Sequence, residues 1–94
     1  MDVEFPFGPQ VEVFKIRGKM FMFISQNLIT VKCDPEMSGE LQNAFPTITP
    51  GYHMNKKHWI SIAEGTPLEL TQDLIEDSYH LVIAGLPKNQ RPII

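Results

Sequence analysis

The sequence predicts one α+β domain, with an antiparallel sheet of at least four strands (a meander plus a later strand) and two main helices. Its first third holds three short apolar segments separated only by turns, which is typical of an antiparallel meander. The residue pattern then takes a helical period twice, and an alternating strand lies between the two helical segments. A chain of 94 residues forms about one domain, so we assign residues 1–94 to a single unit.

Residues 10–16, 20–25 and 28–33 form the predicted meander, because β-branched and aromatic side chains dominate all three segments. Short turns containing Gly18 and Asn27 connect them, and both residue types are frequent in turns because they tolerate positive φ. Ahead of the meander, the prolines of "FPFGP" fix φ and remove backbone donors, which indicates a stiff turn.

The second strand of the meander is apolar on both faces. Strict alternation places Met20, Met22 and Ile24 on one face and Phe21 and Phe23 on the other. A strand of this kind needs cover on both faces. The helices after residue 34 cover one face, so we expect a second copy of the chain to cover the other. The competing cover is the chain's own C-terminal tail.

The first helix is expected over "DPEMSGELQNAF", from residue 34 to residue 45. Asp34 is the predicted N-cap, Pro35 suits the first helical position, and Pro46 ends the helix. The loop "PTITPGY" follows. One apolar stripe is predicted along the helix, made by Met37, Leu41, Ala44 and Phe45.

"HWISI", residues 58–62, alternates with a period of two and is the predicted fourth strand. After the turn "AEGTP", the second helix is expected to begin with Thr71 as its N-cap and to end at Gly85, with Pro87 following. Its predicted apolar face consists of Leu74, Ile75, Tyr79, Val82 and Leu86.

Charge and cysteine content limit the function classes. The net charge of -3 opposes a dedicated nucleic-acid binder unless the cations are clustered. The single cysteine, Cys33, cannot form an intramolecular disulfide and fits a reducing compartment. No apolar run approaches the roughly 18 residues of a membrane span, and the acidic N-terminus does not resemble a signal peptide. We therefore expect a cytoplasmic protein without a membrane partner.

The segment "YHMNKKHWISI", residues 52–62, concentrates residues that carry chemistry. His53 and His58 lack a third nearby ligand residue, so no metal site is predicted. His53 and Asn55 are instead expected to hydrogen-bond the loop backbone. Trp59 is expected to pack in the core against the last helix, while a base-stacking role would require its exposure.

The sequence predicts no enzymatic activity and no cofactor. Cys33 with His53 or His58 is the conceivable nucleophile–base pair, but the neighbouring Asp34 opposes a low thiol pKa. Ser61 and Ser78 lack a nucleophile-elbow motif, and no glycine-rich phosphate loop is present. We therefore predict no catalytic residues.

Several segments resemble the MmcQ/YjbR family of small bacterial proteins: "FPFGP", "VFKIRGKMF", "VKCDPE", "PGYHMNKKHW" and "LIEDSYHLV". The resemblance covers nearly the whole chain, and Pro50–Trp59 is its most specific block. It implies an α+β fold related to the frataxin-like CyaY proteins and DNA binding through a "double wing" of hairpins. It also implies a helix ahead of "FPFGP", which this sequence lacks.

The cation positions are compatible with that implied function. Lysines and an arginine lie at the first hairpin, on the third strand and just before the fourth strand. The predicted partner is double-stranded DNA, contacted at its phosphates. The predicted nucleic-acid-binding residues are Arg17, Lys19, Lys32, His53, Asn55, Lys56 and Lys57. The alternative function is a homodimeric or protein-interaction module without nucleic-acid binding, paired through the face of Met20, Met22 and Ile24.

Overall fold

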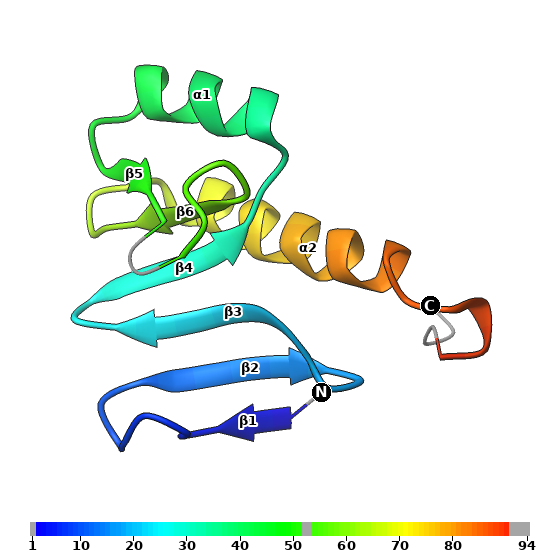
Figure 1. The fold of residues 1–94 in the computed structure, drawn as a ribbon. Helices are drawn as coiled ribbons and strands as arrows, with labels where there is room; N and C mark the ends of the chain where they lie inside the picture. Colours follow the sequence, from blue (N-terminus) through cyan, green and yellow to red (C-terminus); the bar gives the residue numbers. More distant parts are fainter. Residues whose placement is uncertain (1, 52–53, 91–94) are drawn as a thin grey trace.

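The computed structural model describes residues 2–51 and 54–90, with one antiparallel sheet and two α-helices (Figure 1). The elements are β1 (Asp2–Glu4), β2 (Glu12–Ile16), β3 (Lys19–Ser25), β4 (Leu28–Lys32), α1 (Pro35–Ala44), β5 (Ile48–Pro50), β6 (Trp59–Ile62), α2 (Leu68–Ala84) and the short 3-10 helix η1 (Lys88–Gln90). The strand order is β1-β2-β3-β4-β6-β5, and all neighbouring strands are antiparallel. The predicted α+β class, with its meander, later strand and two main helices, is confirmed.

A β-bulge in β3 changes the predicted faces of that strand. Phe14 pairs with Met22, and the next residue, Lys15, pairs with Met20. Phe21, between Met20 and Met22, therefore has no partner of its own in β2 and is the extra residue of the bulge. Met20 and Met22 therefore lie on opposite faces, and the predicted common face of Met20, Met22 and Ile24 is wrong. The bulge instead lets both Phe21 and Met22 join the core.

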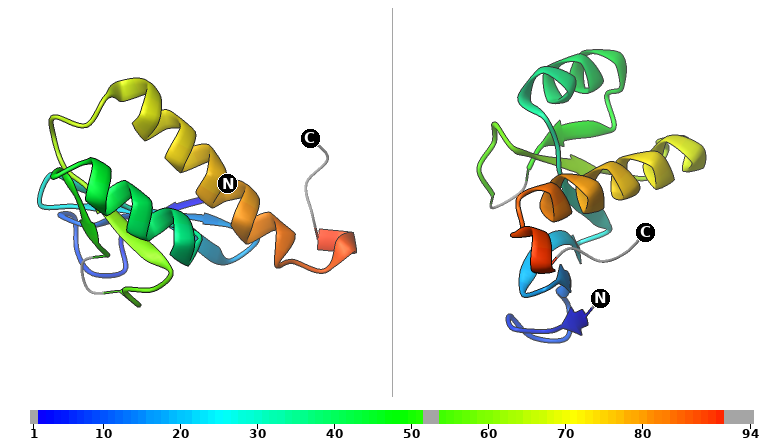
Figure 2. Two further views of the ribbon diagram at one scale, coloured as in Figure 1. Left: turned by 90° about the horizontal axis from the view of Figure 1, so that it is seen from above. Right: turned by 90° about the vertical axis from the view of Figure 1, so that its right-hand side faces the viewer.

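Helix α2 covers one face of the sheet, mainly over β3 and β4 (Figure 2). The core on this face contains Val31 and Ile60, both 0% exposed, and Leu74 from the helix. Phe21 meets Tyr79 edge to face, with ring centroids 5.2 Å apart. The predicted apolar face of α2 is confirmed, since Leu74, Val82 and Leu86 are buried and Ile75 and Tyr79 pack against the core.

The opposite face contains a buried polar pair. Thr30 and Ser61 alternate with the core residues Val31 and Ile60, so they point away from α2. Both side chains are 0% exposed, and their hydroxyl oxygens lie 2.8 Å apart in a hydrogen bond. This pairing satisfies polar groups that would otherwise be costly to bury.

Two short strands were missed in the sequence. β1 precedes the stiff "FPFGP" turn, and β5 lies within the segment 46–52 that was expected to be a loop. Strands of three residues give too little alternation to be recognised. In β5, Ile48 is the buried residue, while Thr49 and Pro50 are exposed.

The helix ends are partly as predicted. The Asp34 carboxylate accepts a hydrogen bond from the Glu36 amide at 3.0 Å, which confirms the N-cap of α1. Helix α2 begins one turn earlier than expected, after Pro67, and the Thr71 hydroxyl donates back to the Pro67 carbonyl at 3.1 Å. Gly85 is the C-cap, as predicted. Neither helix of the described residues is long and apolar enough to cross a membrane.

The predicted apolar stripe of α1 is only partly correct. Leu41 and Phe45 pack against the core, but Met37 is 44% exposed and Ala44 is also exposed. The buried residue of the helix is the polar Ser38, whose hydroxyl accepts a hydrogen bond from the Gln42 amide. Helix α1 packs beside β5, at the edge of the sheet, so it covers less of the core than a helix lying across the sheet would. The tail that was considered as cover for β3, residues 91–94, lies outside the described residues.

Ser78 fastens α2 to the sheet at the bulge. Its hydroxyl accepts a hydrogen bond from the Lys32 amide at 2.8 Å and donates one to the Phe21 carbonyl at 2.5 Å. The side chain is 0% exposed, so water cannot replace either bond. One hydroxyl therefore joins the helix, the end of β4 and the bulged residue of β3.

Replacing Ser78 with Ala should lower the free energy of unfolding by about 2–4 kcal/mol, because a buried donor and a buried acceptor lose their partner. Ser38→Ala is the matched control, since it is also a buried helical serine with the same gain in helix propensity. Its amide partner, Gln42, is half-buried and can turn toward water, so a cost below about 1 kcal/mol is expected. Equal effects in urea unfolding would contradict the proposed role of Ser78.

Candidate nucleic-acid interface

The strand register gathers the predicted cationic segments at one end of the sheet. β2 ends where β3 begins, at the hairpin of Arg17 and Gly18. Lys32, at the end of β4, pairs with Trp59, at the start of β6. The sheet end that carries the first hairpin therefore also carries the loop leading into β6. Segments distant in the sequence meet here only because the strands are antiparallel.

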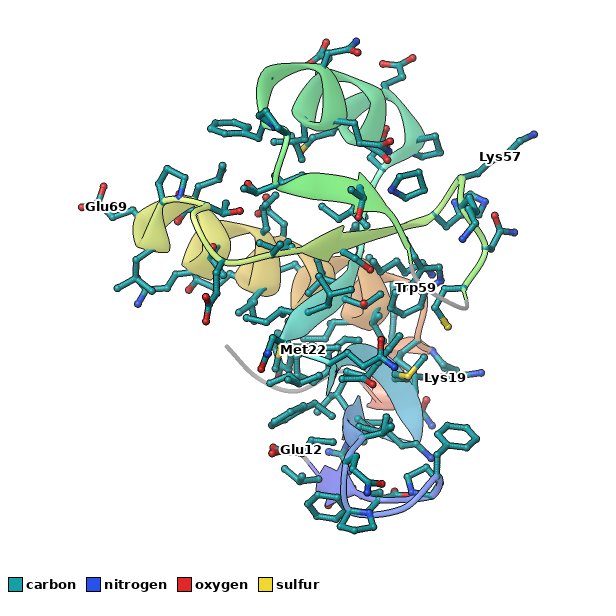
Figure 3. The ribbon with its side chains drawn as sticks, turned by 90° about the vertical axis from the view of Figure 1, so that its left-hand side faces the viewer. Glu12, Lys19, Met22, Lys57, Trp59 and Glu69 are labelled. Atoms are coloured by element: carbon teal, nitrogen blue, oxygen red, sulfur yellow. The ribbon has the colours of Figure 1, made fainter. Side chains whose placement is uncertain are left out.

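Figure 3 shows how two of these cations lie. The Lys19 and Lys57 side chains extend to the same side of the sheet, away from Glu69 on α2. Seven of the eleven carboxylates belong to the helices: three lie on α1 or at its N-cap and four lie on α2. The net charge is negative, but Lys19 and Lys57 lie on the side of the sheet away from Glu69.

The hairpin turn displays Arg17 at its tip. Arg17 and Gly18 have φ values of 51° and 79°, and positive φ at both central positions is the pattern of a type I′ turn. This turn fits the natural twist of the two strands, and it leaves the Arg17 side chain exposed. Gln26 and Asn27 form a similar turn at the opposite end of the sheet.

The loop before β6 is held by its own backbone and side chains. The Asn55 side chain accepts a hydrogen bond from the Lys57 amide at 2.9 Å, which confirms the predicted role of Asn55 in holding the loop. The Lys56 ammonium donates to the Gly51 carbonyl at 2.9 Å. His53 lies outside the described residues. Lys57 therefore lies on a loop that is held by hydrogen bonds, and the Asn55 side chain is used to hold the loop.

Two of the basic residues that the sequence associated with this region, Lys15 and Lys32, are less exposed than the others. Lys15 lies 3.2 Å from the Glu4 carboxylate in an ion pair that offsets its charge. Lys32, one of the predicted binding residues, is half-buried in a groove that it shares with Asp34 and Asp77. The predicted set therefore divides: Arg17, Lys19, Lys56 and Lys57 lie exposed at the hairpin and the loop, whereas Lys32 is half-buried at the end of β4.

Trp59 was expected to pack against the last helix, and this prediction is wrong. Trp59 precedes Ile60, which is fully buried in the core beneath α2, so its side chain points to the opposite face. It is half-buried and lies beside the loop that carries Lys57 (Figure 3). The backbone of Gly51 passes close against it, and the Gly51 amide donates to the Trp59 carbonyl at 2.8 Å.

Cys33 is a structural thiol. It is 5% exposed and lines a groove of about 400 Å³ between the start of α1 and α2. Burial, together with the negative charges of Asp34 and Asp77, raises the pKa of the Cys33 thiol to about 11. The thiol stays protonated at neutral pH, which makes it a poor nucleophile. Within the described ranges, no three His, Cys, Asp or Glu side chains are placed to hold a metal ion.

These features define a small antiparallel-sheet protein of the α+β class, with helix α2 on one face and clustered cations at one end of the sheet. The YjbR family model matches residues 2–81, and the chain belongs to the YjbR family. The resemblance predicted from the sequence segments is confirmed.

Relatives and solved structures agree with this assignment. The uncharacterized protein YbdF of Escherichia coli O157:H7 is 49% identical over 92 residues, which are 92% of this chain and 75% of YbdF. The uncharacterized protein YyaQ of Bacillus subtilis (strain 168) is 49% identical over 57 residues, 58% of this chain and 48% of YyaQ. The crystal structure of Deinococcus radiodurans protein DR2400, with its DUF419 domain, is 37% identical and superposes with a TM-score of 0.87, covering 95% of this chain and 73% of that one. A Pseudomonas syringae protein is 28% identical, with a TM-score of 0.76 over 84% of each chain.

Gly51 is required by the close contact that seats the cationic loop. A Cβ at this position would lie 2.5 Å from the Trp59 Cβ and 2.9 Å from the Trp59 carbonyl carbon and oxygen. Gly51→Ala should therefore destabilise the protein by about 1–3 kcal/mol and shift the Trp59 fluorescence. The control is Gly39→Ala in α1, where a Cβ meets nothing within 4 Å, and where a gain of about 1 kcal/mol is expected. Unchanged stability in Gly51→Ala would refute this account of the loop.

Proposed function

We propose that this protein is a cytoplasmic, non-enzymatic module that binds double-stranded DNA through Arg17, Lys19, Lys56 and Lys57. The observation that carries the proposal is the antiparallel register, which gathers these four cations at one end of the sheet. Glu69, in the first turn of α2, lies away from Lys19 and Lys57, whereas Asp34 and Glu36 at the start of α1 follow β4 at this same end. A local cationic surface can bind phosphates even when the net charge of the chain is negative.

The geometry favours contacts to the phosphate backbone. Arg17 projects from the tip of a two-stranded hairpin, where its exposed guanidinium can reach a phosphate. Lys19 follows it on β3, and Lys57 extends to the same side from the second segment. Lysines act on phosphates as point charges, so we expect affinity with little preference for base sequence.

The chemistry of Cys33 supports a binding role over catalysis. Its raised pKa keeps the thiol protonated, which removes the nucleophile–base pair that the sequence suggested. Ser78 and Ser61 are both fully buried, and the hydrogen bonds of Ser78 to Lys32 and Phe21 join elements of the fold. These side chains serve the packing of the domain.

Neutralising single cations should weaken DNA binding and flatten its salt dependence. For Arg17→Ala and for Lys57→Ala, the slope of log K against log salt should fall by about 0.9 per lost phosphate contact, equally for two unrelated duplexes. Fluorescence anisotropy of labelled duplexes measures this slope. Lys57 is preferred to Lys56, because the Lys56 ammonium also holds the Gly51 carbonyl.

Lys88→Ala is the matched control for these variants, because Lys88 follows α2 and lies outside the hairpin and the loop. Its salt slope should equal that of the wild type. Two outcomes would contradict the proposal: absence of binding to either duplex at about 50 mM salt, or an equal loss of slope in Lys88→Ala.

Self-association remains the second candidate function, and it rests on a different surface from the predicted one. Helix α2 lies over β3 and β4, so the same face of β1 and β2 extends beyond its cover. Val3, on β1, is 46% exposed there, and its pairing partner Phe14 is half-buried. Ile24 of the predicted pairing face is also half-buried on this side. A second copy could cover this apolar area in a two-fold arrangement.

Val3→Lys should abolish such a dimer without disturbing the core, because Val3 is exposed in the monomer. Met22→Lys is unsuitable, since Met22 is 8% exposed and belongs to the core. Light scattering over a range of concentrations should give twice 10.7 kDa for the wild type and the monomer mass for Val3→Lys. Leu68→Lys, at a position that is 70% exposed on α2, is the control and should still dimerise. A wild-type monomer at every concentration would exclude this function.

A further inference from the structure

The face of the sheet opposite α2 contains an apolar cavity that the DNA proposal does not use. Its volume is about 620 Å³, within the usual range for small-molecule sites. The apolar side chains that line it are Phe7, Val11, Val13, Met20, Phe23 and Met54. They come from the N-terminal segment, the first hairpin and the loop before β6, so three separate parts of the chain wall the cavity.

The floor of the cavity is a well-packed part of the sheet. Val13 and Phe23 pair across β2 and β3 and are 2% and 7% exposed, so they form a fixed floor. Met20 reaches this side only because the bulge at Phe21 turns it away from α2. Phe7 is 76% exposed beside the cavity, although burying an aromatic side chain is strongly favourable. An apolar ligand in the cavity would provide the cover that Phe7 lacks.

The charge around the cavity is positive. Gly18 lines it and stands between Arg17 and Lys19 at the hairpin tip. Met54 lines it from the other side and is followed closely in the chain by Lys56 and Lys57. Lys19 and Lys57 extend to this side of the sheet (Figure 3), which favours an anionic group near the cavity.

The carboxylates on this side are fewer. Glu4 and Asp2, on β1, pair in register with Val13 and Lys15, so they share the face of the cavity. Glu4 is held by Lys15, whose side chain lines the cavity. Among the β1 carboxylates, Asp2 therefore remains to oppose Lys19 and Lys57 on this side of the sheet.

We propose that this cavity binds an amphipathic anion, with an unbranched apolar chain against Phe23, Met20 and Met54 and a carboxylate head beside Lys19 at the mouth. Methionine side chains suit a flexible chain, because they adapt to its shape. The proposal rests on the lining and the charge of the cavity, and it does not depend on DNA binding.

The test follows the methionine methyl groups of the full chain by NMR, with decanoate as the probe. Labelling these methyls with carbon-13 gives two reporters in the cavity, Met20 and Met54, and two outside it, Met22 in the core and Met37 on α1. The Met20 and Met54 signals should move in a saturable titration, and the Met22 and Met37 signals should stay in place.

Two series of probes measure separately how the apolar chain and the charged head group of the ligand contribute to its affinity. From hexanoate to octanoate to decanoate, the affinity should rise about fourfold for each methylene, as expected for burial of the chain. Decyltrimethylammonium has the same chain with a cationic head and should bind at least tenfold more weakly than decanoate. Equal affinity for both head groups would overturn the assigned anion.

Variants locate the site. Met54→Gln should weaken decanoate binding at least tenfold, while Met37→Gln should leave it unchanged. Lys19→Glu should weaken decanoate binding, while Lys88→Glu should leave it unchanged. Phe23 is left intact, because its burial makes loss of folding the expected result of changing it.

Three results would overturn the proposal: no shift with decanoate, equal shifts at Met22 or Met37, or shifts of Met20 and Met54 with protein concentration in the absence of decanoate. The last would identify a second copy of the chain as the occupant, and light scattering on the same samples would show its mass. Since no DNA is present in the titration, failure of DNA binding leaves this test unaffected, and failure of decanoate binding leaves the salt-slope test unaffected.

Discussion

The extra residue in β3 decides which side chains reach each face of the sheet. Because Phe21 is bulged, Phe21 and Met22 both enter the core, and Met20 turns to the open face. The bulge needs a partner for its carbonyl, and the Ser78 hydroxyl supplies it while also accepting from the Lys32 amide. The position of α2, the core beneath it and the cavity on the other side all follow from this one junction.

The same sheet separates two chemical environments. The α2 side is apolar at its centre, and burial there, with the charges of Asp34 and Asp77, raises the pKa of Cys33. The opposite side has a fully buried Thr30–Ser61 pair, an apolar cavity and the cations of the hairpin and loop. Large apolar areas open to solvent are uncommon on monomeric proteins and often mark sites of interaction.

The sequence predicts a side-chain role correctly where the hydrogen-bond partner lies within a few residues in the chain. Asp34 caps α1 through the amide two residues later, and Asn55 holds the Lys57 amide at the same spacing. Errors arose where the partner is distant. Thr71 looks like a cap by composition, yet its hydroxyl bonds Pro67 inside the helix. Trp59 was assigned to the core, but register and alternation direct it to the other face.

The sequence by itself determined the α+β class, the meander, both helices and the YjbR family, because hydrophobic period and turn residues act within a few positions of one another. Only the tertiary structure decided which cations meet, which side of the sheet they occupy, and where the open cavity lies. These depend on strand register and on one inserted residue, and a shift of one residue exchanges the faces of a strand. The sequence around Met20 gives no sign of the Ser78 hydroxyl, which lies 58 residues further along the chain. That hydroxyl bonds to the bulged residue of β3, where the register of the strand changes.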